Sequence, residues 1–331
     1  MNQHELYLFI VKKHYDYDGK QHPSSGVLSS VQFVVDMLNA QGLRALMVTA
    51  EDGNSIDALV AQYRPVAVVL EAIWVTPAKM AELMHLHPKV RWTVRAHSEI
   101  AFLAQEGCAV EWLAAFNRLG VEVAFNSDQT AQDWAAVPGL GHASWLPNYY
   151  PLRQTRRPLE HAAALHVGCF GAIRPFKNQL IQAMAAAAFA AQHHRSLVFH
   201  MNGDRVEQFG QSNLKNIQAM LKAAGATLVL HPWQGHTEFL ELIARMEVCM
   251  QVSLTESFNI VSADAVSMGV PLVGSSAITW LPRFSQAPTG DVHGIVEAMD
   301  RAGRISVFMN HEALEDYLCE ARKVWMRWAA L

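Results

Sequence analysis

The stretch TESFNIVSADAVSMGVP at 255–271 contains two acidic residues eight positions apart, Glu256 and Asp264. An apolar run that can form a helix lies between them, and a Gly-Val-Pro sequence follows. Because a carboxylate accepts hydrogen bonds from pairs of sugar hydroxyls, the two acids could hold two different sugars of one ligand. The spacing also fits a helix-capping Glu with a surface Asp, and taken alone it favours this plainer interpretation.

The helix of this stretch is expected to run from about Phe258 to Met268, with Thr255 or Ser257 as its N-terminal cap. The first turn of a helix leaves backbone N–H groups without a partner inside the helix. The N–H groups of Ser257, Phe258 and Asn259 would therefore be available to a ligand at the point where the preceding strand ends.

A second stretch, GAIRPFKNQL at 171–180, follows a buried strand and opens a helix. The dipole and the first N–H groups of a helix favour an anion. Arg174 and Lys177 add two cations three positions apart, which suits a phosphate group. Two ordinary surface charges on a solvated loop are the plainer interpretation, and this stretch taken alone favours it.

The two stretches together fit one chemical object. Cations suit a diphosphate, and carboxylates suit the sugars at its two ends. That object is a nucleoside-diphosphate sugar, such as a UDP-sugar, which would be a co-substrate, so no cofactor is expected. No metal-binding Asp-x-Asp signature is placed to hold the diphosphate, and we therefore expect a metal-independent site.

Composition limits the class of protein. The chain has 331 residues, 51% hydrophobic and 17% charged, so it can bury the cores of two domains and is not of a disordered type. A net charge of −4 argues weakly against a protein held to nucleic acid by bulk charge. The four cysteines form no CxxC pair, which favours reduced thiols over a zinc site. No apolar run is long enough to span a membrane, so we expect a soluble, cytoplasmic protein.

Short β-branched or aromatic runs alternate with helical stretches along the whole chain. The expected strands of the first half are 6–11, 44–50, 66–72, 90–96, 121–127 and 142–148. Those of the second half are 164–172, 196–204, 226–232, 247–253 and 270–276. Near-continuous apolar strands joined by helices predict parallel sheets covered on both faces. We therefore expect an α/β fold with two doubly wound, Rossmann-like domains that face a ligand-binding cleft.

A polar stretch at 149–161 separates the two halves. We expect an N-terminal, acceptor-side domain at 1–149 and a donor domain at 150–309. The last helix, within 310–331, is expected to pack back on the N-terminal domain. Its Trp325 and Trp328 would then be part of that domain's core.

The second half resembles the donor domain of GT-B glycosyltransferases, in particular the large family four (group 1) set. GAIRPFKN is similar to that family's Arg/Lys diphosphate motif, and SLTESFNIVSADAVSMGVP to its E-x7-E segment with a Gly-x-Pro ending. LPNYYP resembles the proline–asparagine step at its domain junction, and Gly203-Asp204 matches the glycine after the next strand. The likeness covers most of residues 145–280.

By this resemblance, Arg174 and Lys177 would bind the diphosphate and Glu256 the transferred sugar. The backbone of Ser257–Ile260 would meet phosphate or sugar, and the second acid would bind the nucleotide ribose. That second acid is Asp264 here, where the family has Glu. The shorter side chain puts the ribose contact and the identity of the donor in question.

Further donor contacts are implied at Gly203 and at Trp233. Trp233 and its neighbours His231 and Pro232 stand where the family often places nucleobase contacts. A Trp buried in the core is an equally good interpretation of that position.

The N-terminal half resembles the family less. HPSSGVLSSV at 22–31 stands where the family keeps a glycine-bearing loop before its first helix, so Ser25 and Gly26 could approach donor phosphate or acceptor. VVLEAIWV at 68–75 places Glu71 in an apolar run. Glu71 is either a buried, hydrogen-bonded carboxylate or an acid on the acceptor side.

VRAHSE at 94–99 gathers polar groups at the carboxyl end of a strand, which suits substrate contact. His97 could orient a hydroxyl, because some family members have a His there that touches the sugar. Glu99 is the candidate for a base, if the reaction needs one. A hydrogen-bonded structural histidine is an equally good interpretation of His97.

The N-terminal half looks like small GT-B transferases encoded by bacteriophages, which often glycosylate modified bases such as 5-hydroxymethylcytosine. A hydroxymethylated DNA acceptor would need a basic, aromatic rim. The residues that could supply this rim are Lys12, Lys13, Tyr15, Tyr17, Lys20, Arg153, Arg156 and Arg157. Solvated loops account for the same residues, and the negative net charge favours that interpretation.

We therefore expect a glycosyltransferase that moves a sugar from a nucleoside-diphosphate sugar to an acceptor hydroxyl, with the departing phosphate stabilised by Arg174 and Lys177. The acceptor could be a hydroxymethylated base, a saccharide, or another small molecule or lipid. The rival hypotheses are a sugar-nucleotide epimerase of the same fold and a non-catalytic protein that binds sugar nucleotides or DNA. The resemblance implies retention of the anomeric configuration.

Overall fold

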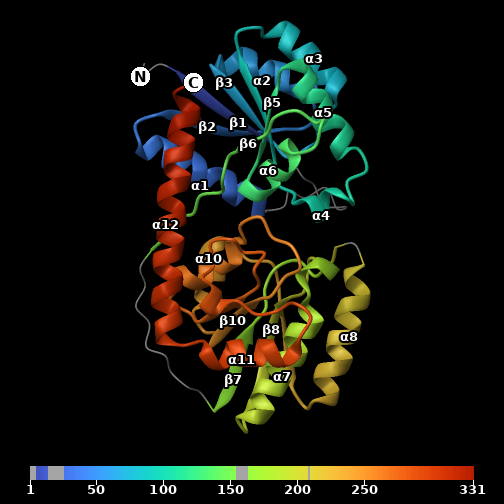
Figure 1. Ribbon diagram of the computed structural model, residues 1–331, viewed down its shortest axis with the longest axis vertical. Coiled ribbons are helices and arrows are strands. Elements are labelled where there is room, and N and C mark those ends of the chain that lie inside the picture. Colours follow the sequence, from blue (N-terminus) through green and yellow to red (C-terminus); the bar gives the residue numbers. More distant parts are fainter. Residues whose placement is uncertain (1–4, 14–25, 154–162, 208) are drawn as a thin grey trace. The chain divides into compact units, whose positions relative to one another are not determined.

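The computed structural model describes residues 5–13, 26–153, 163–207 and 209–331 (Figure 1). The chain forms two compact units, the first made of residues 1–151 with 318–331 and the second of residues 152–317. Each unit is built on one sheet, of six strands in the first and five in the second. All strand pairs within both sheets are parallel. The expected α/β class with two parallel sheets is confirmed.

The sheet of the first unit has the strand order β2-β1-β3-β4-β5-β6. Its strands are β1 (Leu6–Lys12), β2 (Arg44–Ala50), β3 (Ala67–Glu71), β4 (Arg91–Ala96), β5 (Glu122–Phe125) and β6 (Ser144–Trp145). Its helices are α1 (Gly26–Ala40), α2 (Ser55–Tyr63), α3 (Pro77–Leu86), α4 (Ile100–Leu103), α5 (Ala109–Leu119), α6 (Asp128–Ala135) and the end of α12 (Arg304–Ala329). The strand order reverses between β1 and β3, which is the switch point of this sheet.

Strand β1 shows why both faces of this sheet are covered. Successive side chains of a strand point to opposite faces. Leu8 and Ile10 belong to a core shared with α2, α3, α5 and α6, whereas Tyr7 and Phe9 belong to a second core shared with α1 and α12. All four side chains are almost fully buried. The apolar run at 6–11 therefore follows from burial on both faces rather than on one.

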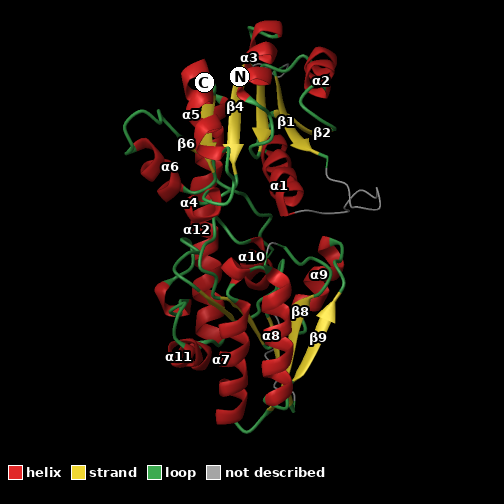
Figure 2. Ribbon diagram, turned by 90° about the vertical axis from the view of Figure 1, so that its right-hand side faces the viewer, coloured by secondary structure: helices red, strands yellow, loops and turns green. Residues whose placement is uncertain are grey.

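The sheet of the second unit has the order β11-β10-β7-β8-β9, with its switch point between β7 and β10. Its strands are β7 (Ala164–Gly168), β8 (Ser196–Asn202), β9 (Thr227–His231), β10 (Val248–Gln251) and β11 (Leu272–Gly274). Its helices are α7 (Gln179–Gln192), α8 (Gly210–Ala223), α9 (His236–Ile243), α10 (Ile260–Ser267) and α11 (Val292–Arg301), with short 3-10 helices η1 (Pro175–Lys177) and η2 (Arg283–Ser285). Helices α7, α8 and α11 share one core with the strands, and α10 packs against β10, β11 and α9 (Figure 2).

Helix α12 begins at Arg304, earlier than the expected last helix at 310–331. The Gly303 N–H donates to Ser306 Oγ at 2.9 Å, a local bond between the residue before the helix and its first turn. The far end of α12 belongs to the first unit, where Trp325 is fully buried and its Nε1 donates to the Pro147 carbonyl at 2.8 Å. In the described part of the chain, no helix is both long and apolar enough to cross a membrane.

Replacing Trp325 by Ala is expected to destabilise the first unit by about 3–5 kcal/mol, because the change leaves a large cavity. The ring lies 5.7 Å from that of Phe9 and 5.4 Å from that of Trp328, and both contacts would be lost. Urea unfolding followed by circular dichroism measures the effect. Ile305→Ala on the same helix is the control, since Ile305 is 69% exposed and should change stability by less than about 0.5 kcal/mol. Equal losses in the two variants would contradict this account of the packing.

Candidate functional site

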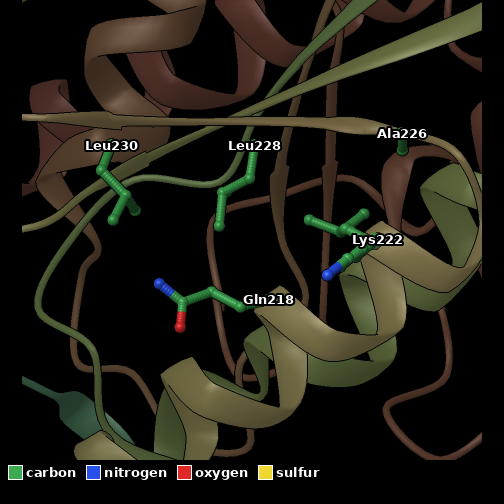
Figure 3. Close-up of a pocket in the computed structure, with 6 residues that line it drawn as sticks. Gln218, Lys222, Ala226, Leu228 and Leu230 are labelled. Atoms are coloured by element: carbon green, nitrogen blue, oxygen red, sulfur yellow. The ribbon is translucent and has the colours of Figure 1, made fainter.

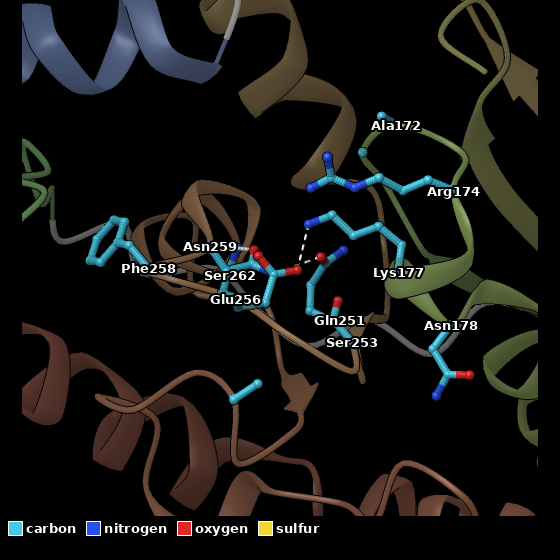
Figure 4. A network of polar contacts seen from close by, with 12 residues as sticks. Ala172, Arg174, Lys177, Asn178, Gln251, Ser253, Glu256, Phe258, Asn259 and Ser262 are labelled. Carbon is cyan, nitrogen blue, oxygen red and sulfur yellow. Dashed lines mark hydrogen bonds and ion pairs between the residues drawn. The ribbon is translucent and has the colours of Figure 1, made fainter. Parts of the chain in front are cut away.

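The two motif stretches of the second half meet at the switch point of the second sheet. Strands β7 and β10 are neighbours, with Val167 paired to Val248 and Gly168 to Cys249. The loop after β7 contains Arg174 and Lys177, and the loop after β10 contains Glu256. Ligands of open parallel sheets bind at the carboxyl ends of the strands at such a point. Figure 4 shows the side chains that gather there.

An ion pair joins the two loops. Lys177 Nζ lies 2.5 Å from Glu256 Oε1, although 79 residues separate them in the sequence. The side chains are only 12% and 8% exposed. Because burying two charges costs about as much desolvation energy as their attraction returns, such a pair is weak evidence for a purely stabilising role. It places a cation and a carboxylate side by side where a ligand is expected.

The backbone of the first loop is shaped to bring Lys177 to this position. Gly171 has a φ of +114°, a backbone conformation that residues with a side chain rarely adopt. Its N–H donates to Asn202 Oδ1 at 2.8 Å, and its α-carbon faces the end of the Lys177 side chain. The Leu254 N–H donates to the Phe176 carbonyl at 2.9 Å, so the two loops are also joined through their backbones.

Arg174 lies beside Lys177. The two side chains extend in the same direction from one loop (Figure 4). Arg174 Nη1 lies 3.3 Å from Glu207 Oε2, and the same carboxylate accepts a hydrogen bond from Arg205 Nε. One carboxylate therefore faces two guanidinium groups, which leaves this part of the site rich in positive charge.

The prediction of the N-terminal cap for the helix after β10 is wrong. The N-terminal cap of α10 is Asn259, not Thr255 or Ser257, and the helix begins at Ile260. Asn259 Oδ1 accepts from the Ser262 N–H at 2.9 Å, and its Nδ2 donates to Gln251 Oε1 at 2.9 Å. Its φ of 64° lies in the left-handed region, which Asn tolerates better than most residues.

The three residues before the cap are thus part of a loop and not of the first helical turn. Phe258 is fully buried, and its ring stacks on that of Tyr317 at a centroid distance of 5.2 Å. Its carbonyl accepts from Trp280 Nε1 at 2.8 Å. These contacts fix the backbone of Ser257 and its neighbours beside Glu256.

Asp264 is not a surface residue, which corrects the plainer interpretation of its position. It is 1% exposed, and its Oδ1 lies 2.7 Å from Nε2 of His236, the first residue of α9. The hydrogen bond to Asp264 raises the pKa of His236, while partial burial lowers it less. His236 was not among the site residues predicted from the sequence. The small and apolar residues on every side of Asp264 were the signal that α10 is buried all round.

The remaining donor candidates lie on the loops after β8 and β9. The Gly203 N–H donates to the His231 carbonyl at 2.8 Å, and the Trp233 N–H donates to Asp204 Oδ2 at 3.0 Å. Trp233 is half-buried, so it is not a core tryptophan, and its ring lies 5.3 Å from the Arg205 guanidinium carbon. The structure thus brings Trp233 into contact with the Arg205 that shares a carboxylate with Arg174.

In the first unit, the side chains of Glu71, Arg95 and His97 form one network at the carboxyl ends of β3 and β4. Glu71 Oε2 lies 3.1 Å from Arg95 Nη1 and 2.5 Å from His97 Nε2. Burial raises the pKa of Glu71, but Arg95 and His97 outweigh it and hold this pKa below its usual range. Burial lowers the pKa of His97. Of the two interpretations left open for Glu71, the structure shows the buried, hydrogen-bonded carboxylate.

The other candidates of the first unit are Glu99, Gly26 and Ser25. Glu99 precedes α4 and accepts a hydrogen bond from the hydroxyl of Thr130. Gly26 is the exposed first residue of α1, and its carbonyl accepts from Ser30 Oγ at 2.8 Å. Ser25 lies outside the described residues.

Most of the expected basic rim also lies outside the described residues. This applies to Tyr15, Tyr17, Lys20, Arg156 and Arg157. Within the described part, Lys13 Nζ lies 2.7 Å from Glu51 Oε1. The rim for a DNA acceptor therefore stays a prediction.

A separate pocket lies between α8 and strand β9 (Figure 3). It is lined by Gln218, Leu221, Lys222, Ala226, Leu228 and Leu230, and none of the candidate residues contributes to it. Over the residues that the structure describes, no group of three or more His, Cys, Asp or Glu side chains could hold a metal ion.

Comparison with solved structures identifies the fold. The chain matches sucrose-phosphate synthase from Thermosynechococcus elongatus with a TM-score of 0.71 and 14% identity, over 98% of each chain. It matches the HepE protein of Anabaena, solved in complex with UDP and glucose, with a TM-score of 0.70 and 14% identity, over 98% of this chain and 100% of that one.

A third match is a UDP-forming trehalose-phosphate synthase from Burkholderia xenovorans, with a TM-score of 0.61 and 11% identity, over 96% and 95% of the two chains. No protein-family model matches the sequence, and no curated protein matches it. The chain therefore has the GT-B glycosyltransferase fold, as the resemblance of its second half implied.

The His236–Asp264 pair predicts a pH-dependent contribution to stability. The pKa of His236 is raised above its ordinary 6.5, so the pair contributes fully below that pH and less as the pH rises through the folded-state value. The difference in unfolding free energy between the wild type and His236→Gln should therefore be largest below pH 6.5 and shrink as the pH rises above it. Urea unfolding at several pH values measures it. A difference that grows with pH would contradict the assignment.

Proposed function

We propose that this protein is a glycosyltransferase that moves a sugar from a UDP-sugar to an acceptor hydroxyl. The observation that carries the proposal is the Lys177–Glu256 ion pair, with Arg174 beside it, at the switch point of a GT-B fold. The HepE protein of similar fold has been solved with UDP and glucose and with UDP-glucose, which supports a UDP-sugar as the donor.

The proposed reaction breaks the bond between the anomeric carbon of the sugar and an oxygen of the diphosphate. Negative charge grows on the leaving diphosphate, and Arg174 and Lys177 stabilise that charge. The acceptor oxygen forms the new bond to the anomeric carbon and gives up its proton, for which His97 and Glu99 are the proposed acceptors. Two cations supply the positive charge that the leaving group needs, so the proposal requires no divalent ion.

Donor binding would exchange the partners of the ion pair. Lys177 would turn from Glu256 to the diphosphate, and Glu256 would accept hydrogen bonds from hydroxyls of the transferred sugar. Lys177 would then have a new anionic partner, and the Glu256 carboxylate would be hydrogen-bonded by hydroxyls, so neither buried group would be left without a hydrogen-bond partner.

The nucleoside end of the donor is assigned to three other groups in this proposal. Asp264 and its partner His236 are proposed for the ribose. The Asp264 side chain is short, and the imidazole of His236, 2.7 Å from its Oδ1, would extend its reach toward the ribose. Trp233 is proposed for the base, and the backbone of Ser257–Ile260 and Gly203 for the phosphates and sugar.

For the acceptor, a saccharide is the better supported of the two main classes. The structural neighbours described above include enzymes named sucrose-phosphate synthase and trehalose-phosphate synthase. A hydroxymethylated base in DNA gains no support from these neighbours and stays a prediction from the sequence. An assay panel should therefore hold mono- and disaccharides, sugar phosphates, and plain and hydroxymethylated DNA.

Removing the cation at the centre of the site should weaken donor binding. Lys177→Ala and Arg174→Ala are each expected to raise the Kd for UDP-glucose about 10- to 100-fold, since a charge-assisted hydrogen bond contributes about 1.5–3 kcal/mol. Glu256→Gln should retain UDP binding and lose most transfer. Calorimetric titration gives the Kd, and chromatography of the products gives the rate. Lys215→Ala, an exposed cation of the same unit, is the matched control.

Three outcomes separate the rival functions. If no nucleoside diphosphate or UDP-sugar raises the melting temperature, the main proposal fails. Formation of an epimer from the UDP-sugar without any acceptor would favour an epimerase. Donor binding without transfer or hydrolysis, unchanged in Arg174→Ala, would favour a non-catalytic binding protein. Transfer that persists in EDTA is the expected result for a reaction supported by two cations.

A further inference from the structure

The first unit contains a buried ion pair that the donor site does not explain. Glu71 and Arg95 are directly opposite each other in the register of β3 and β4, and both side chains are fully buried. A buried ion pair often stabilises a protein no more than apolar residues of the same size would. The function of this pair is therefore to be sought in the other residues that it contacts, and not in its contribution to stability.

Arg95 is held on all sides. Its Nε donates to the Leu146 carbonyl at 2.8 Å, its Nη2 to Asn148 Oδ1 at 2.6 Å, and its Nη1 to Glu71 Oε2 at 3.1 Å. The guanidinium also lies 5.3 Å from the centre of the Trp325 ring. A fixed, permanently charged neighbour keeps Glu71 ionised, and an ionised carboxylate can only accept hydrogen bonds.

His97 lies next to this carboxylate and reaches the surface. Its Nε2 is 2.5 Å from Glu71 Oε2, and the side chain is 12% exposed. Because Glu71 can only accept, Nε2 must carry the proton in this contact. The other ring nitrogen, Nδ1, is then an acceptor, and the Asn126 amide lies 3.4 Å from it.

The backbone beside Glu71 is strained. Ala72 has a φ of 69°, which is uncommon for a residue with a side chain. Its N–H donates to the Arg95 carbonyl at 2.9 Å, and Trp74 Nε1 donates to the Glu71 carbonyl at 2.9 Å. Backbone strain of this kind persists where the surroundings impose it, and it clusters at functional sites. It is independent of the side-chain network and occurs at the same place.

We propose that Glu71, kept ionised by Arg95, is a positioning residue that fixes His97 in the Nε2–H tautomer, so that Nδ1 accepts the hydrogen of a substrate hydroxyl, which replaces the Asn126 amide at that nitrogen. Glu71 acts through His97 and touches no substrate, since it is fully buried. Only the identity of that hydroxyl, as the acceptor or the donor sugar, rests on the proposed function.

If His97 takes the acceptor proton, the balance is simple. The hydroxyl O–H bond breaks and its proton moves to Nδ1, while the oxygen's electron pair forms the bond to the anomeric carbon. The bond from that carbon to the diphosphate breaks, and the diphosphate leaves with its electron pair. Glu71 then faces an imidazolium and stabilises it, as a carboxylate does behind a catalytic histidine.

The tautomer can be measured directly in the wild-type protein by ¹⁵N–¹H correlation NMR of the histidine rings. The chain has 16 histidines, and the His97 signals are identified by their loss in His97→Gln. The expected result is a protonated Nε2 and an unprotonated Nδ1 at neutral pH. A protonated Nδ1 with a bare Nε2 would overturn the proposal, whatever the activity. This measurement needs no change at Glu71, so it stands even if variants there fail to fold.

Glu71→Gln tests the positioning role. Losing the carboxylate should lower the pKa of His97, move the acidic limb of the kcat profile to lower pH, and reduce kcat about 10- to 100-fold with little change in KM. Glu122→Gln is the matched control, because Glu122 accepts bonds from Thr93 and Ser144 in the same sheet. An unchanged pH profile in folded Glu71→Gln would overturn the role. An Nε2–H tautomer without any glycosyl transfer would support this assignment and refute the proposed function.

Discussion

The ion pair between Lys177 and Glu256 is the interaction on which the site of the second unit depends. It joins loops 79 residues apart at 2.5 Å, and both side chains are largely buried. Charges in such a place must be paired, because an unpaired one would cost several kcal/mol. Three features around the pair bring the two charges together. Gly171 adopts a positive φ beside the lysine side chain, and Asn259 turns the chain before α10. The parallel order of β7 and β10 puts both loops at the same end of the sheet.

The first unit also contains a buried ion pair, formed by different residues. Glu71 and Arg95 are paired out of contact with water at the ends of β3 and β4, and His97 lies between this pair and the surface. In both units a costly arrangement of charge is kept at the carboxyl ends of parallel strands, where open α/β sheets bind ligands. We propose that one arrangement serves the donor phosphates and sugar, and that the other orients a hydroxyl.

Much of the fold could be predicted because strands buried on both faces leave an unbroken apolar run, as at 6–11. Contacts were harder to foresee. The meeting of Lys177 with Glu256 follows from the order of the strands, and Glu71 opposite Arg95 follows from their register, which sequence spacing does not contain. The cap at Asn259 was missed because its left-handed backbone delays the start of the helix. Asp264 could be taken for a surface residue because of its charge. Its burial depends on a partner from another helix, His236, which the spacing of α10 does not indicate.

We propose that the Lys177–Glu256 pair is the resting state of a donor site. A crystal structure of the protein with UDP-glucose tests it most directly. We expect the 2.5 Å contact to open, with Lys177 Nζ within hydrogen-bond distance of a diphosphate oxygen and Glu256 in contact with a hydroxyl of the glucose. A structure in which the nucleotide sugar binds elsewhere while the ion pair stays closed would contradict it.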